Sequence, residues 1–314
     1  MHYLINLKTP FIISSLILMA CISCSKDEDT NINNEPEQKS FRVKQSYLLD
    51  ENGTKIQYQT FSYEDDKLGT VETYRIENGL WTIQYKTQVN YDGNQVCIIE
   101  TDADGFEHSI RHTFTFEGEN IATESYWNIT SSPWTECKKL TYQYKNDNLS
   151  SFYFHEINGI TEKDLKGEYI YQDTELQQIK YSFLDSDDQW YENLKWTFTY
   201  SGDCITECTE YYFGIDDDWE YLTDREWKNI YKGVYSYVEN NVSDIQWFYY
   251  DEDSEQWELE YIMKYNSNAC LTEIQIGYNQ NFYYEYEEGI GNEDELGFII
   301  DTEYIFFRYI IGGF

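Results

Sequence analysis

The sequence has few of the residues that break a chain or neutralise its charge. Its 314 residues include only 3 Pro and 17 Gly, which excludes collagen-like and Pro-rich architectures. Basic residues are also scarce, because 22 Lys and Arg stand against 58 Asp and Glu, a net charge of −36. Nucleic-acid binding is therefore excluded, since phosphate contacts need a basic surface. Docking on anionic lipid through protein charge is excluded for the same reason.

Long apolar runs are absent, and the one short run lies near the N-terminus. Phe11–Ala20 has ten apolar or small residues after Lys8, which is too short for a transmembrane helix. This length is typical of the apolar region of a signal peptide. We therefore predict that residues 1–23 are a signal peptide and not part of the fold.

Two cysteines follow this run and resemble the lipobox cysteine of bacterial lipoproteins. In that class the cysteine becomes the new N-terminus and receives fatty acyl chains such as palmitate. We favour Cys24 as the acceptor, because Ser23 precedes it and an acidic segment follows; Cys21, with Leu18 at −3 and Ala20 at −1, is the alternative. Several acyl chains would anchor the protein stably to a membrane.

The segment after Cys24 is polar, acidic and without apolar periodicity, which predicts a flexible tether over residues 24–40. Lys26, Asp27 and Glu28 resemble the surface-export signal of Bacteroidota lipoproteins. The resemblance implies an outer-membrane lipoprotein exposed on the cell surface, with the periplasmic face as the alternative. The mature chain would keep 21 basic and 58 acidic residues, a net charge of −37.

Aromatic residues are plentiful, at 18% with 32 Tyr, and they recur in a fixed pattern. Two aromatic or apolar residues two apart are followed by four polar residues, an aliphatic residue and often another apolar residue three further on. The aliphatic residue follows the second residue of the pair by five in seven copies and by six in the last. The eight copies run Phe61/Tyr63 to Leu68, Val89/Tyr91 to Val96, Phe114/Phe116 to Ile121, Tyr142/Tyr144 to Leu149, Tyr169/Tyr171 to Leu176, Phe198/Tyr200 to Ile205, Tyr235/Tyr237 to Val242, and Met263/Tyr265 to Leu271.

This pattern predicts a β-hairpin in every copy. Residues two apart lie on one face of a strand. The polar residues between the fixed positions, such as Asp65-Asp66 and Gly93-Asn94, favour the positive φ angles of two-residue turns. Repeats of about 28 residues then give an all-β, antiparallel up-and-down meander of about sixteen strands over residues 41–314, with little helix. The segment 296–311 adds one or two strands. Sheets of this size tend to curl or close, so we predict a barrel or a strongly curled sheet.

The repeat also resembles known families. The run from Val89 to Val96 contains Tyr91-Asp92 and resembles the tyrosine-aspartate repeats of Rhs-type and teneurin-like proteins. Residues 41–314 together resemble a family of Bacteroidota lipoproteins with a porin-like fold. That resemblance implies a barrel but no activity, and it supplies no catalytic residues.

Tyr dominates the regular face of the predicted strands, and the opposite face is rich in charged and polar residues. Membrane-spanning barrels instead need Leu, Val and Ile at mid-bilayer, with Tyr confined to the interfaces. We therefore expect a barrel outside the hydrocarbon, with the spanning barrel as the alternative.

The sequence offers no catalytic or metal site. His108 and His112 have metal-site spacing only for a helix; in a strand they lie about 13 Å apart, and His155 lacks a second histidine. No nucleophile elbow or phosphate-binding loop occurs. The acidic turns at 102–105, 185–188 and 216–218 lack the full spacing of a calcium loop, and Asp and Gly form turns without metal. We predict no cofactor.

Five cysteines remain after the anchor: Cys97, Cys137, Cys204, Cys208 and Cys270. Their pairing is open, except that Cys204 and Cys208 in one extended strand are too far apart to bridge each other.

The favoured function is a non-catalytic binding or surface protein, with a glycan or a protein as its ligand. The 9 Trp and 32 Tyr motivate the alternative of a glycan-binding lipoprotein of a polysaccharide-uptake system, since aromatic rings stack on sugars. A hydrolase is a further alternative, because among 58 acidic residues some carboxylate pair is inevitable.

Overall fold

The computed structural model describes residues 40–118, 120–128, 134–146, 148–156, 164–184, 189–213, 227–238, 241–252, 254–268, 270–276 and 280–289. These residues form eighteen strands and no helix. The strands are β1 (Phe41–Leu49), β2 (Lys55–Glu64), β3 (Lys67–Glu77), β4 (Leu80–Asp92), β5 (Gln95–Asp102), β6 (Glu107–Glu117), β7 (Asn120–Asn128), β8 (Thr135–Lys145), β9 (Asn148–Glu156), β10 (Asp164–Gln172), β11 (Glu175–Leu184), β12 (Trp190–Ser201), β13 (Cys204–Phe213), β14 (Trp227–Val238), β15 (Asn241–Asp251), β16 (Gln256–Tyr265), β17 (Leu271–Ile276) and β18 (Gln280–Glu288).

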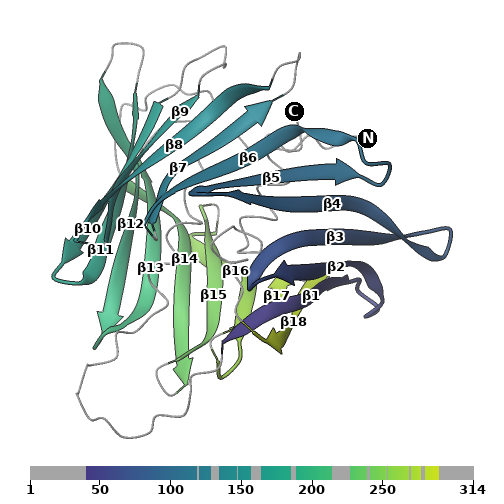
Figure 1. Ribbon diagram of the computed structural model, residues 1–314. Helices are drawn as coiled ribbons and strands as arrows, with labels where there is room; N and C mark the ends of the chain where they lie inside the picture. Colours follow the sequence, from purple (N-terminus) through teal and green to yellow (C-terminus); the bar gives the residue numbers. More distant parts are fainter. Residues whose placement is uncertain are drawn as a thin grey trace, which may run out of the picture.

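The sheet closes into a barrel (Figure 1). Every strand pairs antiparallel with the next in sequence, and β18 pairs with β1 through registers such as Tyr47↔Tyr283. The all-β up-and-down barrel is therefore confirmed. The eight copies of the repeat account for β2 to β17, and the two strands beyond the predicted sixteen are β1 and β18, which make the closure. The strands expected within 296–311 lie outside the described residues.

The turns within the repeats have the predicted geometry. Asp65 and Asp66 both have positive φ, 48° and 63°, as a type I′ turn requires. Positive φ recurs at the corresponding turns of other repeats, at Gly93, Gly118, Asn146, Asp173 and Gly202. The turn residues therefore select the hairpin in each copy.

A β-bulge explains why, in seven of the eight repeats, the second position of the inward face after the turn comes three residues after the first. In seven of the eight repeat hairpins the register shifts just before the second aromatic position, as between Ser62 and Tyr63. The extra residue in the facing strand puts Leu68 and Val71 on the same buried face. The second repeat has no shift, and there the buried positions are Val96 and Ile98, two residues apart. A spacing of three residues between these apolar positions therefore indicates a hairpin with a bulge, and a spacing of two indicates a hairpin without one.

The buried face of the sheet is its concave, inner face. Trp196 on β12 and Trp247 on β15 have ring centroids 5.9 Å apart, although three strand spacings along the sheet amount to about 14 Å. Gly233 on β14 makes this possible, because Trp247 lies over it within van der Waals distance. Gly167 on β10 likewise lets Phe152 on β9 reach Tyr181 on β11, at 5.9 Å between centroids. In these two strands, glycine therefore lies where an aromatic side chain of a neighbouring strand packs directly against the backbone.

The second aromatic of most repeats ties its repeat to an earlier strand. Its hydroxyl donates a hydrogen bond to a backbone carbonyl. For every donor after the first, this carbonyl belongs to the fixed aliphatic residue of an earlier copy. The donors and acceptors are Tyr63 to Val43, Tyr91 to Leu68, Tyr144 to Ile121, Tyr200 to Leu176, Tyr237 to Ile205 and, on β18, Tyr286 to Leu271. These bonds of 2.7–3.1 Å explain why Tyr, more than Phe, fills this position.

Candidate functional site

The two ends of the barrel differ in chemistry. One end, the short-turn end, carries the turns within the repeats together with Ser40 and Gly289, whose amide donates to the Ser40 carbonyl at 3.0 Å. The other, the loop end, carries the connections between repeats. Eleven of the thirteen exposed large apolar side chains of the described residues lie toward the loop end: Ile56, Ile76, Leu80, Trp81, Ile83, Phe106, Tyr153, Trp190, Tyr191, Tyr249 and Leu259. Any tether at Ser40 therefore leaves the end opposite to these side chains.

Two of the exposed aromatic residues form a small cluster on the outer wall. Tyr153 on β9 alternates with the buried Phe152 and Phe154, so its side chain points outward. Its ring centroid lies 6.0 Å from that of Trp190, with the planes at 69°. The Tyr153 and Trp190 side chains are 39% and 38% exposed, which leaves ring surface open to solvent.

Charged side chains flank this pair. The Lys166 ammonium lies 5.7 Å from a Trp190 ring centroid. On the neighbouring strands the Lys180 Nζ donates to Glu192 Oε2 at 3.0 Å, and each of the two side chains is about one-third exposed. We call Tyr153, Trp190, Lys166, Lys180 and Glu192 the wall cluster. It joins open aromatic surface to partly exposed hydrogen-bonding groups.

Cations over indole rings recur around the loop end. Arg111 lies over Trp134, Lys195 over Trp227 and Lys232 over Trp257, at 3.9–4.6 Å from the ring centroids. Such contacts are attractive through the ring quadrupole. These three cations thus cover tryptophans at or beside the start of strands, a role that could not be predicted from the sequence.

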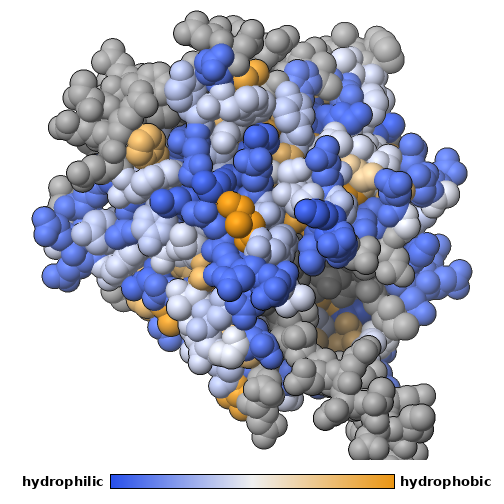
Figure 2. All heavy atoms as spheres, turned by 90° about the vertical axis from the view of Figure 1, so that its left-hand side faces the viewer, coloured by the Kyte–Doolittle hydropathy of each residue, from blue (hydrophilic) through white to orange (hydrophobic). Residues whose placement is uncertain are grey.

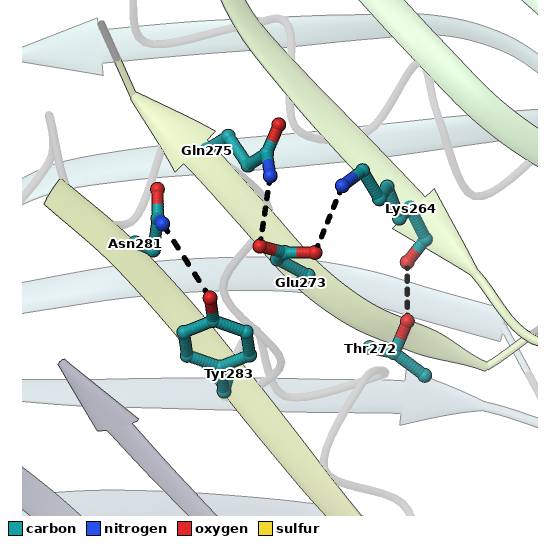
Figure 3. A network of polar contacts seen from close by, with 6 residues as sticks. All are labelled: Lys264, Thr272, Glu273, Gln275, Asn281 and Tyr283. Atoms are coloured by element: carbon teal, nitrogen blue, oxygen red, sulfur yellow. Dashed lines mark hydrogen bonds and ion pairs between the residues drawn. The ribbon is translucent and has the colours of Figure 1, made fainter. Parts of the chain in front are cut away.

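Elsewhere the outer wall carries polar networks. On β16, β17 and β18, Glu273 accepts hydrogen bonds from Lys264 at 3.0 Å and from Gln275 at 2.9 Å, and Asn281 donates to the Tyr283 hydroxyl (Figure 3). Burial opposes ionisation of Glu273, but hydrogen bonds from Gln275, Lys264 and Tyr283 lower its pKa. The face around β10 to β12 is mostly hydrophilic, with apolar side chains scattered among polar ones (Figure 2).

One carboxylate inside the barrel has a full set of donors. Glu124 occupies the second apolar position of the third repeat and lies 2.7 Å from His112 Nε2. It accepts hydrogen bonds from Tyr126 at 2.8 Å and Tyr142 at 2.7 Å. Burial raises the pKa of Glu124, but the His112 charge and the bonds from His112, Tyr142 and Tyr126 outweigh it and lower the pKa. His112 and the two tyrosines thus favour the ionised form of Glu124.

A second internal carboxyl group lacks such donors. Glu210 on β13 is 4% exposed, and its Oε2 has no hydrogen-bond partner among the described residues. Burial raises the pKa of Glu210 to about 8, so the protonated form predominates at neutral pH. Burial, with Glu260 and Glu210 nearby, also raises the pKa of Tyr231.

The predicted anchor and export residues lie outside the described residues: Cys24, the alternative Cys21, and Lys26, Asp27 and Glu28. The signal peptide 1–23 and the tether up to residue 39 lie there too, so these stay predictions. None of the described segments forms a helix that is long and apolar enough to cross a membrane.

The histidine and cysteine positions agree with the extended structure predicted for them. His108 and His112 share strand β6, and the ring of His112 stacks on Tyr126 at 4.2 Å. The His112 ring is therefore packed against an aromatic neighbour, and its partner Glu124 was not predicted from the sequence. The available signal was a glutamate at an apolar position of the repeat. Cys204 and Cys208 both lie on β13.

The acidic turn at 102–105 is explained by its own backbone. Asp102 Oδ1 accepts from the amides of Asp104 and Phe106 at 3.0 and 2.9 Å, as an Asx turn does. The other two acidic turns lie outside the described residues. Within the described part of the chain, no three His, Cys, Asp or Glu side chains are grouped to hold a metal ion.

The chain matches no protein-family model and no curated protein sequence. It is similar in structure to a porin-like protein from Bacteroides uniformis, at 12% identity and TM-score 0.39 over 81% of this chain and 100% of that one. A porin-like protein from Bacteroides vulgatus is similar at 14% identity and TM-score 0.31, over 78% and 98%. A DUF3836 family protein from Parabacteroides distasonis is similar at 12% and 0.26, over 43% and 98%. Such low identities and TM-scores carry no argument about function, and the fold class rests on this chain's own strand pairing.

Proposed function

We propose that the protein is a non-catalytic glycan-binding lipoprotein of the outer membrane, and that the wall cluster contacts the glycan. The observation that carries the proposal is the pair of half-open aromatic rings, Tyr153 and Trp190, beside the Lys180–Glu192 pair. An aromatic ring offers an apolar plane that fits the C–H face of a sugar ring. Lys and Glu supply the donors and acceptors that sugar hydroxyls need.

The charge of the molecule narrows the class of glycan. A chain with a net charge of −36 repels polyanions over a Debye length of about 8 Å at physiological salt. Uronate-rich or sulfated chains are therefore disfavoured. A neutral polysaccharide meets no such barrier, and it can use both rings and the flanking charges.

Binding to soluble neutral polysaccharides tests this function. Affinity electrophoresis against xylan, galactomannan, β-glucan and starch should retard the native protein with at least one of them, and polygalacturonate should not. Trp190→Ala should weaken that binding at least tenfold, which corresponds to about 1.4 kcal/mol. Trp81→Ala removes an indole of similar exposure elsewhere on the loop end and is the matched control. Failure of every polysaccharide to bind, or an equal effect of both substitutions, contradicts the proposal.

The anchor is proposed from the sequence, with support from the position of Ser40 at the short-turn end. A lipid at Cys24 would place the loop end and the wall cluster away from the membrane. Cys24→Ala should release the protein from the membrane fraction and abolish acyl labelling. Labelling that persists in this variant and is lost only in Cys21→Ala would identify Cys21 as the acceptor.

Export to the cell surface has its own test. Replacing Lys26, Asp27 and Glu28 together by Ala should leave the protein lipidated but protected from protease added to whole cells. Equal protease sensitivity before and after the change would favour a periplasmic location that does not depend on these residues.

A further inference from the structure

Exposed apolar side chains gather on one hairpin at the loop end. Ile76 on β3 pairs directly with Trp81 on β4, Glu77 pairs with Leu80, and Tyr74 pairs with Ile83. On β2, Gln57 pairs with Arg75, which puts Ile56 beside Ile76. Opposed residues on one face of a sheet have their Cβ atoms about 5 Å apart. Ile56, Ile76, Trp81 and Ile83 share one face of these strands and therefore form one continuous surface, which we call the hairpin patch, whereas Leu80 and Glu77 lie on the opposite face.

The hairpin patch faces outward and is the largest such group among the described residues. Val71 and Thr73 on β3 are buried, so Tyr74 and Ile76, which alternate with them, point away from the interior. Ile76 and Trp81 are 44% and 39% exposed. Four of the thirteen exposed large apolar side chains thus lie on one face of three adjacent strands.

The patch is held rigid by its own neighbours. Trp81 packs edge-on against Tyr58 at 4.7 Å, and Tyr58 stacks on Tyr74 at 4.5 Å with the planes 9° apart. Polar side chains at its border on the same face are already paired: the Tyr74 hydroxyl donates to Glu72 at 2.7 Å, and Lys86 lies 3.7 Å from Glu72. An apolar centre with a satisfied polar rim is the anatomy of a protein interface, and an ordered Trp is the commonest kind of anchor residue.

We propose that the hairpin patch is a docking surface for an apolar segment of a basic partner protein. Long-range charge selects the partner, because a chain of net charge −36 attracts a basic surface and repels a second copy of itself. Strand addition is excluded, since β2, β3 and β4 each have a partner on both sides. A glycan is a poor occupant, because three of the four residues are aliphatic and have no ring to stack on a sugar.

A designed amphipathic peptide tests this chemistry on the native protein. A fluorescent Leu/Lys peptide should bind at physiological salt, as measured by anisotropy. A Gly/Lys peptide of equal charge should bind at least tenfold more weakly, and a Leu/Glu peptide should not bind. Ile76→Ser and Ile83→Ser, which leave the Tyr58–Trp81 contact in place, should each weaken binding of the Leu/Lys peptide several-fold, and the double substitution at least tenfold.

Val238→Ser is the matched control, since Val238 is 62% exposed at the short-turn end, and it should leave the affinity unchanged. Circular dichroism shows whether each variant is folded. Equal binding by the Gly/Lys peptide would reduce the effect to charge alone and overturn the proposal. So would unchanged affinity of the double variant, dimerisation of the protein through the patch, or binding to phosphatidylcholine vesicles in place of the peptide.

Discussion

Two glutamates inside the barrel have opposite environments. Glu124 lies among His112, Tyr126 and Tyr142, whose contacts lower its pKa in spite of burial. Glu210 is more deeply buried, its Oε2 has no hydrogen-bond partner among the described residues, and burial raises its pKa to about 8. Burial disfavours the ionised form of both carboxyl groups, and only Glu124 has donors that outweigh it.

The raised pKa of Glu210 makes stability fall with rising pH. Below the unfolded pKa of about 4.5 both states are protonated. Between about 4.5 and 8 only the folded state keeps the proton, so the free energy of unfolding decreases across this window and then levels off. Glu210→Gln removes the titrating group and keeps the shape. We expect it to be stabilising by at least about 1 kcal/mol at pH 8 and nearly neutral at pH 4.5.

Urea unfolding of the native protein and of Glu210→Gln at the two pH values measures this difference. Glu207→Gln, on the same strand, serves as the control for a charge lost from a carboxylate that is not buried. A Glu210→Gln effect that is the same at both pH values would show that Glu210 does not titrate in the window.

At the scale of the element, the strands of the barrel are bent and crossed at set positions. The bulge in seven repeat hairpins bends each hairpin and increases its twist. Gly167 and Gly233 leave room for Phe152 and Trp247 to lie across a neighbouring strand. The bulges and the two glycines bring side chains of one sheet together on its concave face. The hydrophobic core of the barrel is therefore made by residues of this single sheet.

Gly167→Ala tests the crossing of Phe152 over β10. A Cβ at residue 167 would lie 1.8 Å from Phe152 Cε1, so the ring must move out of the core. We expect a loss of about 1–3 kcal/mol or more in unfolding free energy, the range for overpacking. Gly69→Ala is the matched control, since its Cβ would meet Ser62 O at 3.5 Å, an ordinary contact.

Adding Phe152→Leu to Gly167→Ala should recover part of the loss, because the smaller side chain frees the space. Chemical denaturation of the single and double variants provides the comparison. Equal stability of Gly167→Ala and Gly69→Ala would contradict the close passage of the Phe152 ring.

At the scale of the whole molecule, closure gives the barrel an apolar inside and a mostly polar outside. Leu68, Val71 and Ile179 are fully or almost fully buried, whereas the outer wall carries networks such as Lys264–Glu273–Gln275. This is the reverse of a membrane barrel, whose outer band is apolar and whose lumen is polar. The polar outer wall is the reason to expect that the barrel lies outside the hydrocarbon.

The fragment 40–314, without the signal peptide and most of the tether, should be soluble without detergent. Its circular dichroism should show strand with little helix. Unfolding in urea should be a single transition, because the eighteen paired strands form one closed sheet. A fragment that folds only in detergent micelles would favour the membrane-spanning barrel instead.

Much of the fold could be predicted from the sequence, because its causes are local. Residues two apart share a strand face, and Asp65-Asp66 suit a hairpin turn, so each repeat specifies its own hairpin. The candidate site was less predictable. The abundance of Tyr and Trp suggested a glycan ligand, but nothing in the chain indicated that Tyr153 and Trp190, 37 positions apart, lie together. Their contact depends on two intervening strands.

The sequence by itself determined the hairpins, their bulges and the inward face of each strand, since these follow from turn residues and from side-chain spacing within about 28 residues. Only the tertiary structure decided that β18 pairs with β1, that Glu124 has His112 beside it, and that Trp247 reaches Trp196 over Gly233. The physical reason is that closure brings together strands at the two ends of the sequence, and curvature brings together rings that are three strands apart. Neither the closure nor the curvature of the sheet can be deduced from a single repeat.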